Sequence, residues 1–155
     1  MKRILTTAVL FFLAFMAAQQ ASAQRVDPGT ILARQTTVDQ GLFFALARGD
    51  VNTMTVYRDQ GADPNISLTI LGLKAREIFG KDQPIFKAPF DPSGWPILTW
   101  AVYLDNEEAV KLLLRSGARV NAPDVYGATA LHWAAWAGQH TVAKILLNNG
   151  ANCLA

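Results

Sequence analysis

The second half of this chain repeats itself, and this repetition limits the possible folds more than any other feature. Asp91-Pro-Ser-Gly94 is followed by an apolar stretch and the pair Gly117-Ala118, and the same order starts again at Asp124-Val-Tyr-Gly127. Matched positions in the two copies are 33 residues apart. A fixed period of roughly 20–50 residues is typical of solenoids, in which each repeat packs mainly against its neighbours.

The second part of each copy has the pattern of an amphipathic helix. Gly117 and Gly150 stand where these helices should end in a left-handed residue. Each of these segments is therefore predicted to be a helix with one buried face. The apolar residues at helical spacing are Ala109, Val110, Leu112 and Leu113 in the first copy and Val142, Ile145 and Leu146 in the second.

These residues resemble the ankyrin repeat, whose pattern is D-x-x-G-x-T-P-L-H-x-A-A-x-x-G-H followed by V-V-x-L-L-L-x-x-G-A-D-x-N. Residues 127–135, Gly-Ala-Thr-Ala-Leu-His-Trp-Ala-Ala, match it closely. The resemblance covers about residues 36–65 and 91–152. It implies an all-α ankyrin-repeat solenoid of about three helix-turn-helix repeats with hairpin loops. The departures are Pro96-Ile97-Leu98-Thr99 for T-P-L-H, Asp105 for the turn glycine and Ala130 for the proline of the first helix.

A degenerate copy precedes the two clear ones. Gly49 and Gly61 keep the spacing of 12 residues that the turn and loop glycines have in the last copy. Its opening turn is missing, because Val38 and Gln40 stand where the family has glycine and threonine. An array needs about three repeats for stability, so we expect this one to be only marginally stable. The expected repeats are about residues 36–65, 91–123 and 124–155.

An insertion separates the first repeat from the second. Gly61 and Gly117 are 56 residues apart where one period would be 33, so 23 extra residues lie at about 66–90. The pattern predicts a short helix that starts at Ile66, followed by a turn at residues 81–84. Insertions in repeat arrays map to loops, often on the binding face. The alternative, a helix pair or lid that only covers the weak first repeat, stays open.

The first 23 residues have the parts of a secretory signal peptide. Met1-Lys2-Arg3 is a positive start, residues 4–18 are apolar, and Ala21-Ser22-Ala23 is a small-x-small cleavage site. A retained anchor is the alternative, but the apolar run falls short of the ~20 residues that a bilayer core needs. We expect a signal peptide at 1–23 and an ankyrin repeat domain at 24–155. The mature chain should lie in the periplasm or be secreted, without a membrane span.

Charge and cysteine content narrow the partners of this mature chain. Without Lys2 and Arg3 it has 12 basic and 12 acidic residues and is formally neutral. It lacks the positive surplus on which nucleic-acid binding depends, so nucleic acid is not an expected partner. Cys153 is the only cysteine, and after export its thiol would be either free or joined to another chain.

The histidines do not form a metal or catalytic pattern. His132 occupies the T-P-L-H position, where the resemblance implies a structural hydrogen bond between neighbouring hairpin loops. His140 lies eight residues further on, with no cysteine or carboxylate cluster nearby. Zinc ligation therefore has no support, and we expect no metal and no other cofactor.

The candidate catalytic groups are equally weak. Ser116, His132 and Asp124 form a triad only on paper, since any chain of this size offers such a triple. Glu107-Glu108 opens a second helix, where acidic residues favour the positive end of the helix dipole. A small hydrolase with its site in the insertion is the competing hypothesis, but residues 66–90 hold no histidine or cysteine. We expect no catalytic residues and no enzyme activity.

The aromatic residues point instead to a binding surface. In the ankyrin family, partner contacts come mainly from the two residues between Asp and Gly, the residue after Gly and the two before the turn glycine. Exposed aromatic residues are enriched at binding hot spots, whereas Trp100 and Trp133 stand at a family leucine position and should be core. The alternative is that these aromatics pack under the insertion. The candidate partner-binding residues are Trp95, Tyr103, Leu104, Val125, Tyr126 and Trp136, and the remaining family positions are Pro92, Ser93, Ala128 and Ala137.

The last helix, residues 141–149, reads like an internal one, although repeat arrays usually end with a polar outer face. Ile145, Leu146 and Leu154 would then meet water. A homodimer through this C-terminal face, assisted by Cys153, would cover it. A partner protein, the insertion or a truncated coding sequence are the alternatives.

The sequence therefore predicts an exported protein-protein interaction module that binds a partner protein through its concave face, without catalysis. Two roles fit such a module. It would be an immunity-like protein that neutralises an exported toxic effector, or an envelope accessory protein in stress defence. The residues do not choose between them.

Overall fold

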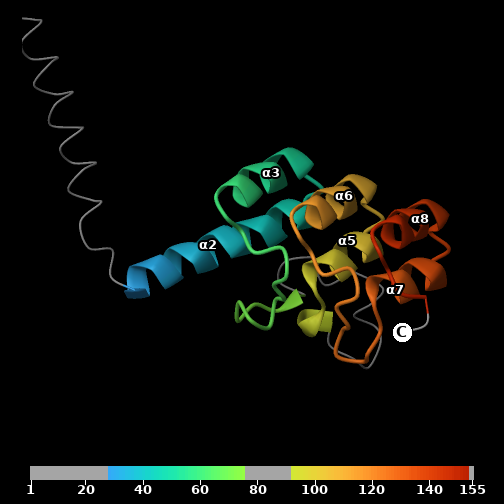
Figure 1. Ribbon diagram of the computed structural model, residues 1–155. Helices are drawn as coiled ribbons and strands as arrows, with labels where there is room; N and C mark the ends of the chain where they lie inside the picture. Colours follow the sequence, from blue (N-terminus) through green and yellow to red (C-terminus); the bar gives the residue numbers. More distant parts are fainter. Residues whose placement is uncertain (1–27, 76–91, 154–155) are drawn as a thin grey trace, which may run out of the picture. The chain divides into compact units, whose positions relative to one another are not determined.

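The structure is a computed structural model that describes residues 28–75 and 92–153 (Figure 1). The predicted signal peptide, residues 81–84 of the insertion and Leu154 lie outside the described residues. The chain divides into two compact units, Met1–Arg34 and Gln35–Ala155. The packing below is that of the second unit.

The described residues contain only helices, turns and one isolated β-bridge between Ser67 and Pro96. The predicted all-α fold of helix-turn-helix repeats is confirmed. None of the described helices is long and apolar enough to span a membrane. The elements are α2 (Pro28–Ala47), α3 (Val51–Asp59), the 3-10 turn η2 (Pro92–Gly94), α5 (Ile97–Tyr103), α6 (Glu107–Arg115), α7 (Ala130–Trp136) and α8 (His140–Asn148).

The helices form antiparallel pairs that stack in chain order. In repeat two α5 packs on α6, and in repeat three α7 packs on α8. Between repeats, α5 packs on α7, α6 on α8 and α3 on α6. The second helices α3, α6 and α8 therefore form one layer and the first helices α5 and α7 the other (Figure 1).

Left-handed residues end the helices at the predicted places. Gly117 and Gly150 have φ values of 90° and 86°, which a residue without a Cβ adopts at little cost. Asp105, which replaces the turn glycine in repeat two, also has a positive φ of 53°. The substitution therefore keeps the turn in a conformation that aspartate tolerates better than most residues.

Repeat one differs from the other two at its start. Its first helix, α2, is 20 residues long, against seven in α5, and runs through the positions where the opening turn would lie. Asp39 on α2 is buried, and its Oδ1 accepts hydrogen bonds from the Gln35 amide at 3.0 Å and from the backbone N–H of Asp63 at 2.9 Å. The carboxylate ties α2 to the loop after α3 in place of the missing turn.

Two asparagines join the loops of neighbouring repeats in the same way. Asn65 Nδ2 donates to the carbonyl of Gly117 at 3.3 Å, and Asn65 Oδ1 accepts from the N–H of Arg119 at 2.8 Å. Asn121 makes the equivalent pair of bonds one repeat later, to the Gly150 carbonyl at 3.0 Å and from the Asn152 N–H at 2.8 Å. The first bond spans 52 residues and its equivalent 29. The register of the stack is therefore the same on both sides of the insertion.

The described part of the insertion packs on repeat two. The predicted helix from Ile66 is wrong for residues 66–74, which form turns. Backbone bonds to repeat two hold these turns: the N–H of Thr69 donates to the Ser93 carbonyl at 3.0 Å, and the N–H of Ile97 donates to the Ile66 carbonyl at 3.1 Å. The Leu68 side chain is fully buried. This segment therefore covers repeat two as well as following repeat one.

The apolar residue of α8 that is exposed at the end of the array differs from the residues that the sequence predicts. Leu146 is fully buried, and Ile145 is half-buried, because both point back toward the stack. The next residue, Leu147, is 48% exposed. The prediction that Leu146 meets water is therefore wrong by one helical position.

The asparagine bridges give the first prediction. Asn65→Ala should lower the free energy of unfolding by about 1–2 kcal/mol, because it removes both bonds that hold repeats one and two in register across the insertion. Urea denaturation measures this loss. Asn52→Ala is the matched control, since Asn52 is exposed on α3, and an equal effect of both substitutions would contradict the proposed role of the bridge.

Candidate functional site

Trp95 does not lie at the surface, where its prediction as a partner-binding residue places it. Its side chain is fully buried. The ring lies among three other aromatic rings, with centroid distances of 4.3 Å to Trp133, 5.2 Å to Trp100 and 5.8 Å to Tyr103. Trp95 therefore belongs to the core between repeats two and three.

The turn that precedes Trp95 is covered in a way that the family pattern does not contain. Its residues Pro92 and Ser93 are also buried. The insertion bonds to this turn twice through Ser93: the carbonyl accepts from Thr69 N–H, and Oγ accepts from Ala75 N–H at 3.2 Å. The loop positions of repeat two that contact partners in other ankyrin proteins are therefore occupied by the chain itself. At Pro92 and Ser93 the alternative interpretation holds, in which the family's contact positions pack under the insertion.

Tyr103 and Leu104, at the end of α5, are half-buried. The Tyr103 ring meets the edges of Trp95 and Trp100 at centroid distances of 5.8 and 6.0 Å. These two residues offer only part of their surface to a partner.

The predicted residues of repeat three are exposed. Val125 is 61% exposed, Tyr126 58% and Trp136 76%. We call these three residues the repeat-three surface. Large exposed apolar patches on proteins often mark interaction sites.

Asp124 shapes the turn that presents Val125 and Tyr126. It is buried, and its Oδ1 accepts hydrogen bonds from the N–H groups of Tyr126 at 2.8 Å and Ala128 at 2.9 Å. Its Oδ2 accepts from the indole N–H of Trp133 at 3.0 Å. The turn is therefore fixed from inside while its apolar side chains point outward.

Trp133 joins this turn to Trp136. It is half-buried, and its ring packs on Trp95 and meets the edge of Trp136 at a centroid distance of 5.9 Å and an interplanar angle of 77°. An aromatic row made of Trp100, Trp95, Trp133 and Trp136 thus runs from the core to the surface. Trp100 is fully buried, as predicted, and Trp136 is the exposed end of the row.

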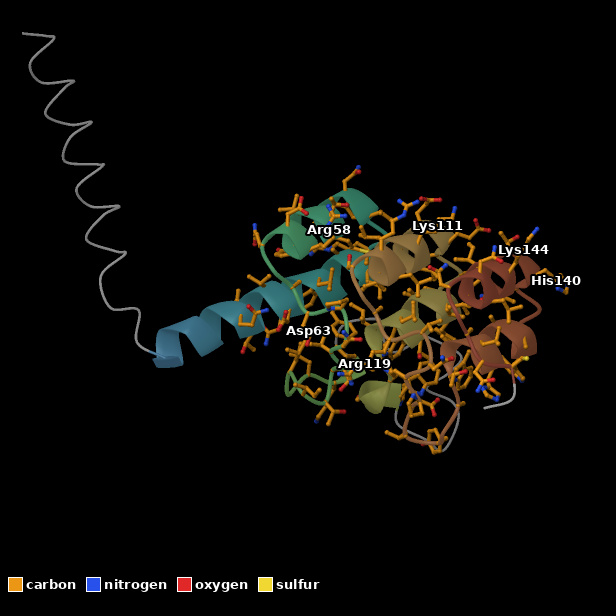
Figure 2. The ribbon with its side chains drawn as sticks, viewed as in Figure 1. Arg58, Asp63, Lys111, Arg119, His140 and Lys144 are labelled. Atoms are coloured by element: carbon orange, nitrogen blue, oxygen red, sulfur yellow. The ribbon has the colours of Figure 1, made fainter. Side chains whose placement is uncertain are left out.

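Two lysines lie on the second helices, away from the repeat-three surface. Lys111 and Lys144 belong to α6 and α8, in the layer of second helices, and Figure 2 shows them there with His140. Lys111 bridges Glu108 at 2.7 Å and Glu107 at 3.7 Å. The bond from the Lys111 ammonium lowers the pKa of Glu108 and raises the pKa of Lys111. Glu107 and Glu108 lie in the first turn of α6, where carboxylates stabilise the positive end of the helix dipole.

The two histidines have no catalytic geometry. His132 is exposed, and its Nδ1 accepts from the Thr129 N–H at 3.2 Å and lies 2.9 Å from Thr129 Oγ1. This bond caps the helix to which His132 itself belongs, which is a structural role. The prediction of a bond from His132 to a neighbouring hairpin loop is wrong, since the His132 bonds of the described residues are local. His140 lines a shallow groove of about 340 Å³ with Asp105 and Glu107. Within residues 28–75 and 92–153, no three metal-ligating side chains cluster.

The structure does not assemble a catalytic triad from Ser116, His132 and Asp124. Ser116 Oγ donates to the Leu112 carbonyl at 2.8 Å. His132 accepts a hydrogen bond from the Thr129 N–H. Asp124 accepts hydrogen bonds from the Tyr126 N–H in its own turn and from the Trp133 indole. Each member has a local structural partner.

Comparison with known proteins agrees with this geometry. The family model for ankyrin repeats in three copies matches residues 42–155. The chain therefore belongs to the ankyrin repeat family, whose repeats are protein-interaction modules.

Curated relatives match part of this chain. The chain is 32% identical over 125 residues to a palmitoyltransferase, AKR1, of Lachancea kluyveri, which covers 72% of this chain and 17% of that protein. It is 40% identical over 62 residues to the Saccharomyces cerevisiae palmitoyltransferase AKR1, covering 40% of this chain and 8% of that protein. It is 43% identical over 53 residues to human inversin, covering 32% and 5%. The chain thus spans less than a fifth of the length of each.

The split between buried and exposed tryptophans gives the second prediction. Trp95→Ala should cost roughly 3–5 kcal/mol of stability, because it empties the centre of the aromatic row. Trp136→Ala should cost about 1 kcal/mol or less, because only an edge contact is lost. Chemical denaturation followed by far-UV circular dichroism compares these two identical substitutions, and similar losses would contradict the assignment.

Proposed function

We propose that this chain is an exported protein-interaction module that binds a partner protein through the concave face of its repeats, without catalysis or a cofactor. The contacts come from the repeat-three surface, Val125, Tyr126 and Trp136, with Tyr103 and Leu104 at its border. The observation that carries the proposal is Trp136, an indole that is 76% exposed at the end of a packed aromatic row.

The physical reason is preorganisation. Tryptophan and tyrosine bury a large area on binding with few rotatable bonds, so they lose little entropy when a partner covers them. The edge contact with Trp133 and the Asp124 turn already restrict this surface before a partner arrives. Binding therefore gains the burial of apolar area at a low ordering cost.

Export is part of the proposal because of residues 1–23. Their positive start, apolar run and Ala-Ser-Ala end have the composition of a cleaved signal peptide. We place the mature chain in the periplasm or outside the cell. The transferase activity of the fungal relatives is not part of the proposal, because the region shared with the Lachancea kluyveri protein is 17% of that protein's length.

The third prediction concerns the partner. Trp136→Ala should weaken binding by about 2 kcal/mol, roughly thirty-fold in Kd, while the fold remains intact. Ile70→Ala is the matched control, because Ile70 is 74% exposed but lies in the insertion. Both variants and the wild type serve as baits for envelope proteins, and titration calorimetry then measures the affinity of the retained protein. A partner bound equally by all three would place the contact elsewhere.

The fourth prediction concerns processing. The protein isolated from the envelope fraction should begin at Gln24, because the peptide bond after Ala21-Ser22-Ala23 is the expected cleavage site. N-terminal sequencing identifies the first residue. Replacement of Ala23 by a bulky residue, Ala23→Leu, should leave the leader attached, and wild-type protein that still starts at Met1 would contradict export by this route.

A further inference from the structure

The exposed end of repeat three carries an apolar groove. It has a volume of about 350 Å³, and Leu131, Ala135, Ala143 and Leu147 supply its apolar lining. Leu147 is 48% exposed. We call these four residues the C-terminal face. His132, Asn152 and Cys153 complete the lining, so no Asp, Glu, Lys or Arg of the described residues takes part in it.

The 33-residue period shows what such a face does inside the array. One period earlier, the equivalents of Leu131, Ala135 and Ala143 are Leu98, Val102 and Val110. These three side chains are 2%, 0% and 0% exposed, and Leu114, the equivalent of Leu147, is half-buried. They are covered because α7 and α8 of repeat three pack on α5 and α6. Repeat two thus shows the same face covered by the helix pair of the next repeat.

The opposite end of the array has the complementary feature. Phe44 on α2 is 42% exposed and Val56 on α3 is 52% exposed. We call these two residues the N-terminal face. With the spacing of 56 residues between repeats one and two, their equivalents are Trp100 and Leu112, which are 0% and 7% exposed.

The later repeats show which way these positions point. Trp133, the next equivalent of Phe44, packs on Trp95 of the preceding repeat at 4.3 Å. Leu112 belongs to α6, which packs on α3 of the preceding repeat. Phe44 and Val56 therefore occupy positions that later repeats bury against the repeat before them.

We propose that a second copy of this chain stacks head to tail on the first, with the N-terminal face of one copy in the C-terminal groove of the other. Each copy carries both halves of the interface that the chain already forms between its own repeats. Two C-terminal faces placed back to back would oppose groove to groove, whereas a head-to-tail contact repeats the order in which α7 and α8 pack on α5 and α6. The contact continues the repeat stack across two chains.

Such a contact is heterologous, so it does not close on a dimer. Longer oligomers should appear as the protein concentration rises, and the melting temperature should rise with them, because association stabilises the folded chain by mass action. The surface used is separate from Trp136, so partner binding and stacking fail independently in the tests.

The experiment uses one blocking charge on each face, in the chain that begins at Gln24. Leu147→Glu blocks the C-terminal face and Val56→Glu the N-terminal face, and both positions are about half exposed, so the fold should tolerate the charge. Light scattering coupled to size-exclusion chromatography follows the mass across a dilution series. Wild type and the control Ile70→Glu should associate, and each blocked variant alone should associate at least about ten-fold more weakly, because a buried unpaired charge is costly.

Mixing the two blocked variants is the decisive step. Leu147→Glu keeps an intact N-terminal face and Val56→Glu an intact C-terminal face, so the mixture should form a one-to-one dimer that does not grow. Self-association of Val56→Glu alone would indicate back-to-back pairing and overturn the proposal. Wild type that stays monomeric at every concentration would overturn it as well. If circular dichroism shows that Leu147→Glu is unfolded, Ala135→Glu takes its place.

Discussion

The stacking of one helix pair on the next is the interaction on which the rest of this structure depends. A single pair of seven- and nine-residue helices cannot bury its own apolar faces, so its stability comes from the neighbouring repeat. Trp95 shows this directly, because a side chain of repeat two is buried partly by Trp133 of repeat three. The asparagine bridges add direction to this packing, since their paired bonds fix how one loop sits on the next.

The insertion keeps this stacking and changes which of the family's contact positions are exposed. Asn65 holds its bonds across the extra residues, so the chain gains a segment without losing the stack. Residues 66–75 then bond to the turn that holds Ser93 and cover the positions where an ordinary repeat would meet a partner. The free contact positions are left on repeat three, whose turn is fixed by Asp124.

Features that repeat at a fixed period were predictable from the sequence, and features that depend on a unique segment were not. The period and the apolar spacing predict the helices, and the loop glycines predict their left-handed ends. The same reasoning misplaced Trp95, because the family pattern tells which loop a residue belongs to but not what lies on top of it. It also exchanged Leu146 for Leu147, since residues about 100° apart on a helix differ in exposure and an apolar run alone does not orient the face.

Helix α7 shows how a short element serves three contacts at once. Ala130 and Ala134, four residues apart, are buried in the stack, while Leu131 and Ala135 line the end groove. Trp133 and Trp136, three residues apart, continue the aromatic row to the surface. Spacings of three and four residues keep each pair on its own side of the helix. A partner on Trp136 and a second chain in the groove therefore meet different sides of α7, and the binding of one leaves the surface of the other uncovered.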